Sequence, residues 1–195
     1  MQVGPDLYSY IATKNLWLKY CNAGSDRLDQ CTLELKESPL LIRVCQAAIN
    51  MADRSIYMTS GDVAGNTSKS CDLYDIERDK WVIAPELQLA RTYHSGCALG
   101  DNAFVFCGTG MRVKLNSIEV LDTRADSQIW RLIDIPEDLL SARVNPVVVA
   151  ASTNEILIMG GYNNVYYGDI NVFNTETEIV KHEKTLASKF CAISN

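Results

Sequence analysis

The chain has 195 residues, of which 47% are hydrophobic and 22% charged, and its formal net charge at pH 7 is −6. This length fits one domain or two small ones, and the composition excludes a disordered tail, a coiled coil and a collagen-like fibre. The negative charge gives no electrostatic support for binding a phosphate backbone, so we expect no nucleic-acid partner.

Two further features bear on the cellular compartment. No apolar run reaches the roughly 18 residues that cross a bilayer, and residues 1–6 lack the basic and apolar regions of a secretion signal. The seven cysteines are odd in number and contain no C-x-x-C pair, which favours buried thiols in a reducing compartment over a disulfide framework. We therefore expect a cytoplasmic protein with no membrane partner.

At the start of the chain, residues 1–41 form a degenerate copy of a unit that recurs more clearly afterwards. The segment Ile11–Leu18 resembles Ala98–Val105, and Cys31–Leu35 resembles Cys71–Asp75. We predict that this region is a degenerate first blade.

Three clearer units follow at 42–89, 90–141 and 142–187, because three landmarks recur in one register. Residues 188–195 resemble the start of the unit at 42 and are predicted to begin a further strand or blade. The landmarks are an arginine (Arg43, Arg91, Arg143), the end of an apolar run (Ser60, Gly108, Gly160) and the end of a later strand (Asp75, Asp122, Asn174).

Each unit is predicted to contain four short strands. The first opens at the arginine, and a polar turn leads to the second, which is apolar and ends at glycine. The third ends in aspartate or asparagine, which suit a turn. The fourth carries Trp81 or Trp130, where the third unit has only Ile179-Val180. With no helix of any length predicted, the fold class is all-β.

These residues resemble the kelch repeat, in which a double glycine follows an apolar strand and a Tyr and a Trp come later. Gly160-Gly161 matches the double glycine fully, whereas Ser60-Gly61 and Gly108-Thr109 each match by half. The resemblance implies a kelch-type β-propeller or partial propeller of four-stranded blades. The WD40 repeat fits less well, because the chain has no Trp-Asp pair. The motif residues are expected to be structural, with the tryptophans in equivalent positions between blades: Gly61, Gly108, Gly160, Gly161, Tyr74, Trp81 and Trp130.

Catalytic patterns are weak. His94 lies in an apolar segment and His182 in a charged one, and no nucleophile elbow, phosphate-binding loop or dinucleotide fingerprint occurs. We therefore predict no catalytic residue, no metal and no cofactor. The alternative is a kelch-type oxidase or sugar isomerase, although two separate histidines make a poor copper site.

The loops that follow the apolar strands are the predicted partner-binding elements, because tyrosine is enriched at recognition surfaces. The predicted binding residues are Arg112, Lys114, Tyr162, Asn163, Asn164, Tyr166 and Tyr167.

The predicted function is a non-catalytic protein–protein interaction module or scaffold within a larger protein or assembly. The resemblance implies roles such as substrate reception for ubiquitin ligases or scaffolding of cytoskeletal and ciliary assemblies. A purely structural subunit of a large complex is a further alternative. Because about four units leave sheet faces open, we expect the chain to be incomplete alone and a second chain to complete the propeller.

Overall fold

The computed structural model describes residues 7–11, 16–20, 34–37, 43–44, 46–51 and 55–189, and every regular element among them is a β-strand. The prediction of an all-β fold is confirmed for these residues. The chain divides into two compact units, Met1–Arg43 and Val44–Asn195. The predicted strand at 188–195 lies almost wholly outside the described residues, which end at 189.

The first unit contains one antiparallel sheet of three strands. These are β1 (Leu7–Ile11), β2 (Leu16–Tyr20) and β3 (Glu34–Glu37), in the order β1-β2-β3. Residues Ile11 and Leu16 pair across the first connection.

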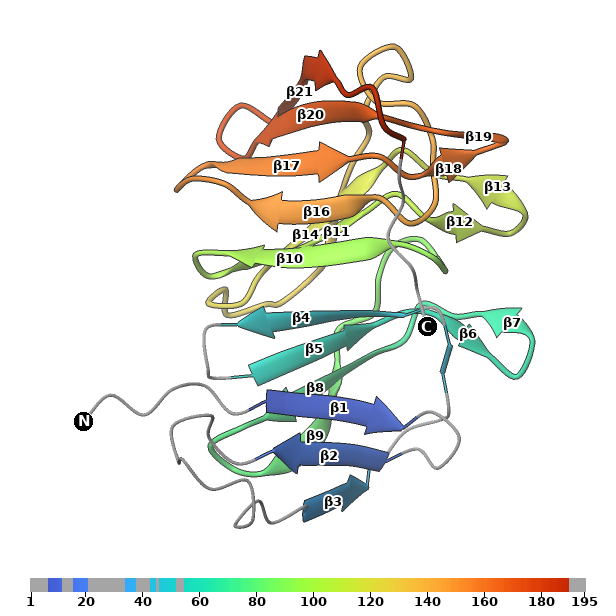
Figure 1. The fold of residues 1–195 in the computed structure, drawn as a ribbon. Coiled ribbons are helices and arrows are strands. Elements are labelled where there is room, and N and C mark those ends of the chain that lie inside the picture. Colours follow the sequence, from blue (N-terminus) through green and yellow to red (C-terminus); the bar gives the residue numbers. More distant parts are fainter. Residues whose placement is uncertain are drawn as a thin grey trace, which may run out of the picture. The chain divides into compact units, whose positions relative to one another are not determined.

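The second unit contains three antiparallel sheets of four strands each, and in each sheet the strands lie in chain order (Figure 1). Within this second unit we call them the first, middle and last blade, so that the first blade here is the predicted unit at 42–89 and not the degenerate one at 1–41. The first blade comprises β4 (Ala47–Met51), β5 (Ser55–Thr59), β8 (Cys71–Asp75) and β9 (Lys80–Ala84), the middle blade β10 (Ser95–Leu99), β11 (Asn102–Phe106), β14 (Ile118–Asp122) and β15 (Arg131–Ile133), and the last blade β16 (Val147–Ala150), β17 (Glu155–Met159), β20 (Asp169–Asn174) and β21 (Ile179–Thr185).

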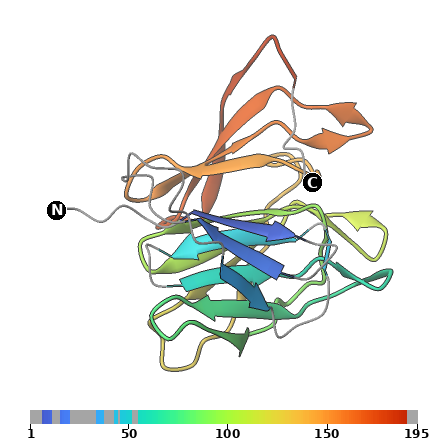
Figure 2. The ribbon, with the colours of Figure 1, turned by 60° about the horizontal axis from the view of Figure 1, so that its bottom comes forward.

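Between the second and third strand of every blade lies a small two-stranded hairpin. The three hairpins lie on the same side of the three blades in both views (Figures 1 and 2). They are β6 (Asp62–Val63) with β7 (Asn66–Thr67), β12 (Thr109–Gly110) with β13 (Val113–Lys114), and β18 (Tyr162–Asn163) with β19 (Val165–Tyr166).

The middle blade supplies two hydrophobic cores because successive side chains of a strand point to opposite faces. On β11, Ala103 and Val105 belong to the core shared with the first blade. Phe104 and Phe106 belong to the core shared with the last blade. The blades are thus held together by apolar packing, with the middle one covered on both faces.

Tyr74 pairs with Trp81 across β8 and β9. In the middle blade, Val120 of β14 pairs with Arg131 of β15. The next position in the same antiparallel register places Leu121 opposite Trp130. The two tryptophans therefore hold equivalent strand positions. Their burial differs, because Trp130 is fully buried against the first blade whereas Trp81 is only half-buried.

The double-glycine alignment of the middle unit needs a correction. The expected match was Gly108-Thr109, but Cys107 (φ 59°) and Gly108 (φ 94°) adopt the backbone of Gly160 (φ 62°) and Gly161 (φ 99°). The middle unit is one residue shorter between its arginine and this turn, so spacing alone shifted the match by one. A side chain on Gly108 would place its Cβ 2.7 Å from the Thr92 carbonyl oxygen.

The repeated arginines do not open the first strands as predicted. Strand β10 begins at Ser95, four residues after Arg91, and Thr92 instead forms an isolated bridge with Thr109. The backbone N–H of Gly108 donates to the Arg143 carbonyl at 2.9 Å. These arginines therefore belong to the connections that join each blade to its neighbour.

Candidate functional site

Two hairpins from neighbouring blades meet in a single surface. Lys114 of β13 donates through Nζ to Oδ1 of Asn163 at 2.8 Å and to Oδ1 of Asn164 at 3.4 Å. The same ammonium lies 5.3 Å from the ring centroid of Tyr162, within cation–π range. We call this region the hairpin surface, formed by Met111, Arg112, Val113, Lys114, Tyr162, Asn163, Asn164, Val165 and Tyr166.

The turn of the middle hairpin has an unusual backbone. Gly110 pairs with Val113, and the two residues between them, Met111 (φ 44°) and Arg112 (φ 70°), are both left-handed. Glycine and asparagine are the ordinary occupants of such positions, and other side chains cost roughly 1–2 kcal/mol each. The corresponding turn of the first blade has Ala64 and Gly65, so the middle hairpin carries more backbone strain.

Aromatic contacts divide the predicted tyrosines into two groups. Tyr162 and Tyr166 pack with ring centroids 5.0 Å apart, and Tyr166 keeps 52% of its surface exposed. Tyr167 instead packs 4.2 Å from the guanidinium of the buried Arg143. Tyr167 therefore braces the connection between blades, whereas the other six predicted binding residues lie together on the hairpin surface.

Exposed apolar side chains are the part of this surface that sequence reasoning missed. Met111 is 88% exposed and Val113 63%, and Val165 on the neighbouring hairpin is also exposed. Isolated exposed hydrophobes are common, but a cluster on adjoining loops is typical of an interaction site. No local pattern separates these three residues from the buried ones, since each lies in a loop of mixed polarity.

Beneath the hairpins, buried ion pairs hold the connections in place. Arg91 and Glu119 form a fully buried pair at 2.7 Å, and Glu119 also accepts from the backbone N–H groups of Gln88 and Leu89. Burial lowers the pKa of Arg91, while Glu119 opposes that shift. The arginines were recognised only as sequence landmarks, because their carboxylate partners occupy different positions in successive units.

The last blade has a related pair that is less deeply buried. Arg143 makes two hydrogen bonds to the Asp169 carboxylate, at 2.7 and 2.9 Å. Burial alone would raise the pKa of Asp169, but hydrogen bonds from Arg143 and Asn171 outweigh it and lower that pKa. The pair fixes the backbone next to Gly160, since Arg143 also donates to its carbonyl at 2.9 Å.

The histidines lie in separate environments. His94 is buried with Nε2 2.9 Å from the Thr59 hydroxyl oxygen, and burial lowers its pKa to about 3, so its ring is neutral. His182 is exposed on β21. Across the described part of the chain, no three His, Cys, Asp or Glu side chains are grouped so as to hold a metal ion.

The described cysteines lie within the packed blades, fully or partly buried. Cys71, Cys97 and Cys107 are not in disulfide bonds, and burial raises the pKa of Cys97 and of Cys107 to about 12. A thiol with so high a pKa is a poor nucleophile. The other four cysteines, for which buried thiols were also predicted, lie outside the described residues: Cys21, Cys31, Cys45 and Cys191.

Comparison with known proteins places this geometry in a family. The KLHDC2/KLHL20/DRC7 Kelch-repeats domain matches residues 26–189. An F-box/kelch-repeat protein of Arabidopsis thaliana is 26% identical over 124 residues, which cover 62% of this chain and 32% of that protein. Kelch repeat and BTB domain-containing protein 2 of cowpox virus (strain Brighton Red) is 21% identical over 100 residues, 51% of this chain and 16% of that protein.

The matched segments thus span at most about a third of these relatives. Within the described residues there is no helix long and apolar enough to cross a membrane. The family match covers all three four-stranded blades and confirms that they are blades of a kelch-type partial β-propeller. The chain belongs to the kelch-repeat family.

Proposed function

We propose that this chain is a non-catalytic protein-binding module and that its partner contacts the hairpin surface. The observation that carries the proposal is the turn at Met111 and Arg112, which holds two large side chains in a strained, left-handed backbone at an exposed tip. A strained backbone that contributes nothing to a core is typical of ligand-contacting loops. Glycine at either position would relieve the strain but would remove the exposed side chain.

The composition of the surface indicates the chemistry of the partner. Arg112 and Lys114 supply positive charge in a chain whose net charge is −6, while Met111, Val113 and Tyr166 supply exposed apolar area. A segment that alternates acidic and apolar side chains would complement both features. The relatives' names join kelch repeats to an F-box or a BTB domain, which supports a role as the partner-binding part of a larger protein or assembly.

The test is selection of peptides from a random phage-displayed library on the full chain, followed by calorimetric titration. We expect selected peptides rich in acidic and apolar residues. Met111→Glu and Tyr166→Ala should each weaken binding by about tenfold. The control Ile129→Glu, at an exposed apolar residue of the β14–β15 turn, should leave affinity unchanged. Equal loss in the control, or none in the hairpin variants, would contradict the proposal.

A second candidate is a structural subunit whose propeller another chain completes. One face of the last blade carries Val149, exposed, and Leu157 and Met159, half-buried, and no described strand of the second unit packs on it. An uncovered apolar sheet face favours association. Sedimentation velocity of the isolated 195-residue chain tests this candidate. Self-association supports it, whereas a stable compact monomer argues against it.

A further inference from the structure

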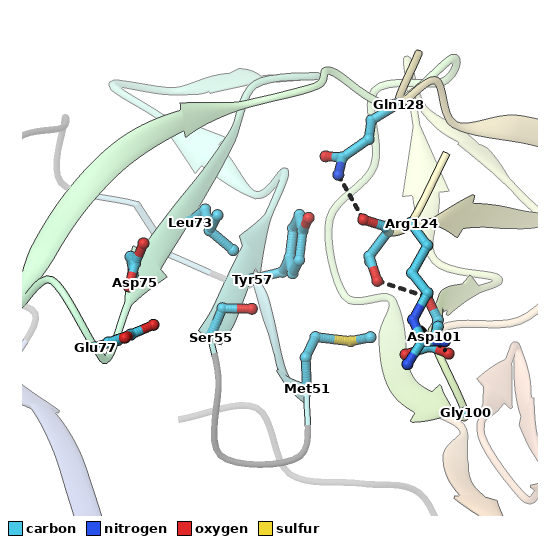
Figure 3. Close-up of a pocket in the computed structure, with 11 residues that line it drawn as sticks. Met51, Ser55, Tyr57, Leu73, Asp75, Glu77, Gly100, Asp101, Arg124 and Gln128 are labelled. Atoms are coloured by element: carbon cyan, nitrogen blue, oxygen red, sulfur yellow. Dashed lines mark hydrogen bonds and ion pairs between the residues drawn. The ribbon is translucent and has the colours of Figure 1, made fainter. Parts of the chain in front are cut away.

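A cavity of about 560 Å³ opens between the first and middle blades, at the strand ends away from the hairpins (Figure 3). Its walls come from the facing ends of β4 and β5 and from β8, with the connections between β8 and β9, β10 and β11, and β14 and β15. The first blade forms one wall and the middle blade the other. The hairpin surface shares no residue with this cavity.

The cavity floor is apolar with a single hydroxyl. Met51 and Leu73 line it beside Tyr57, whose side chain packs edge-on against Trp130 at 6.5 Å. Tyr57 is only 2% exposed, and no described residue forms a hydrogen bond with its hydroxyl. Burial raises the pKa of Tyr57, so the hydroxyl is a neutral group. A hydroxyl at the cavity surface can donate a hydrogen bond to, or accept one from, a molecule that enters the cavity.

Further unused acceptors line the walls. Gln128 donates through Nε2 to the Thr123 carbonyl at 2.7 Å, so its amide oxygen is left as an acceptor for another partner. The hydroxyl of Ser55 also makes no hydrogen bond to any described residue, and it stands beside Tyr57 on the same wall (Figure 3). The cavity thus offers oxygen acceptors from both blades around an apolar floor.

The described lining of the cavity contains more carboxylates than ion-pair partners. Asp101 is neutralised by Arg124 at 2.9 Å on the middle-blade wall. On the other wall Asp75 is neutralised by Arg78 at 2.7 Å. Among the described lining residues, Glu77 is the only carboxylate without such a pair. The described lining carboxylates and their two arginine partners therefore carry one net negative charge, at the rim beside Glu77.

We propose that this cavity binds an arginine side chain presented by a protein partner. The aliphatic part of arginine would cover Met51 and Leu73, as long basic side chains do on apolar surface. The guanidinium offers five N–H donors and one positive charge, which matches dispersed oxygen acceptors and the single carboxylate of Glu77. This site is additional to the hairpin surface and stands whether or not that surface binds a partner.

Nuclear magnetic resonance titration of the full chain tests the proposal, with N-acetyl-arginine methylamide as the probe. The corresponding citrulline amide is the matched control, because it has the same shape without the charge. We expect saturable shifts in the amides of residues 73–77, 100–101 and 123–128. Citrulline should bind about tenfold more weakly, since it loses the charge-assisted contacts.

Variants assign the binding to the named groups. Glu77→Gln should weaken the arginine probe about fivefold, as expected for an exposed ion pair, and Tyr57→Phe about threefold through loss of one hydrogen bond. Glu176→Gln is the matched control, since Glu176 follows Asn174 as Glu77 follows Asp75 in the first blade. Tyr166→Ala, on the hairpin surface, should leave the probe's affinity unchanged.

Three results would overturn the proposal. They are shifts that do not saturate, equal affinity for the citrulline amide, and equal weakening by Glu176→Gln and Glu77→Gln. None of these would affect the hairpin proposal, because its test uses a different probe and different variants.

Discussion

The middle and last blades have the same strand order but different surroundings. On β11 of the middle blade, alternate residues enter two cores, so Val105 and Phe106 are both fully buried. On β17 of the last blade, Ile156 and Ile158 are buried, but Leu157 between them is only half-buried. The strand order of a blade is thus the same whatever packs against it, whereas the burial of its side chains depends on what covers each face.

The ion pair of the middle blade is likewise more deeply buried than that of the last blade. The side chains of Arg91 and Glu119 in the middle blade are entirely inaccessible, whereas Asp169, the partner of Arg143, keeps 19% of its side-chain surface exposed. Removing one member of a pair costs most where the other member cannot reach water. The comparison therefore predicts different penalties for the same change in the two blades.

The largest effect is expected from Arg91→Met. It leaves the Glu119 carboxyl group buried without its ion-pair partner and removes hydrogen bonds to the Cys107 and Ser117 carbonyls, so the free energy of unfolding should fall by about 4–5 kcal/mol. Arg143→Met should cost about half as much, because water reaches Asp169. Urea unfolding of both variants gives the comparison. Equal losses would show that burial does not set the difference.

Trp130→Ala should cost about 3–4 kcal/mol, because it truncates a fully buried aromatic side chain that also donates to the Pro85 carbonyl at 3.0 Å. Trp81→Ala should cost about 2 kcal/mol or less, since Trp81 is half-buried. The same unfolding measurement applies. A larger loss of stability for Trp81→Ala than for Trp130→Ala would contradict the conclusion that Trp130 is the more deeply buried of the two.

Gly108→Ala should destabilise the protein by about 2–3 kcal/mol, because φ is 94° and the new Cβ would lie 2.7 Å from the Thr92 carbonyl oxygen. Gly100→Ala is the matched control. Gly100 also has a positive φ, 60°, but a Cβ added there would have no other atom within 4 Å, so its cost should be about 1 kcal/mol. Thermal unfolding of the two variants separates the contact from the backbone strain, and equal shifts would rule the contact out.

The smallest effect concerns pH. Burial lowers the pKa of His94 from 6.5 to about 3. Below pH 6.5 the imidazole is therefore protonated in the unfolded chain, whereas in the folded chain it stays neutral down to about pH 3. Stability therefore falls as the pH falls through this window, by about 2 kcal/mol from this group between pH 7 and 5. His94→Gln should lose that part of the pH dependence. An unchanged pH profile in the variant would mean that His94 does not titrate this way.

The sequence was sufficient to predict the four-stranded unit, because strand, turn and glycine signals are local. It also predicted the equivalence of Trp81 and Trp130, but not their different burial, which depends on the neighbouring blade. The turn at Cys107 and Gly108 was misaligned by one residue because spacing does not reveal φ. The ion pair of Arg91 with Glu119 and the exposure of Met111 and Val113 depend on contacts between distant residues, which no local pattern carries.

The same limit applies to the candidate sites. Six of the seven predicted binding residues lie on the hairpin surface because they come from corresponding loops of adjacent blades. Tyr167 does not, because the buried guanidinium of Arg143 draws its ring inward. The cavity beside Tyr57 was not foreseen, since its lining residues come from separate strand ends and turns far apart in the sequence.

Hydrogen-exchange mass spectrometry of the full chain, with and without a peptide selected on it, tests whether the two hairpins act as one binding surface. Because Lys114 of one hairpin forms hydrogen bonds with Asn163 and Asn164 of the other, we expect slower exchange at both 109–114 and 162–166 when the peptide binds. Protection of only one hairpin, or protection confined to other segments, would contradict the claim that these two hairpins form a single partner-binding surface.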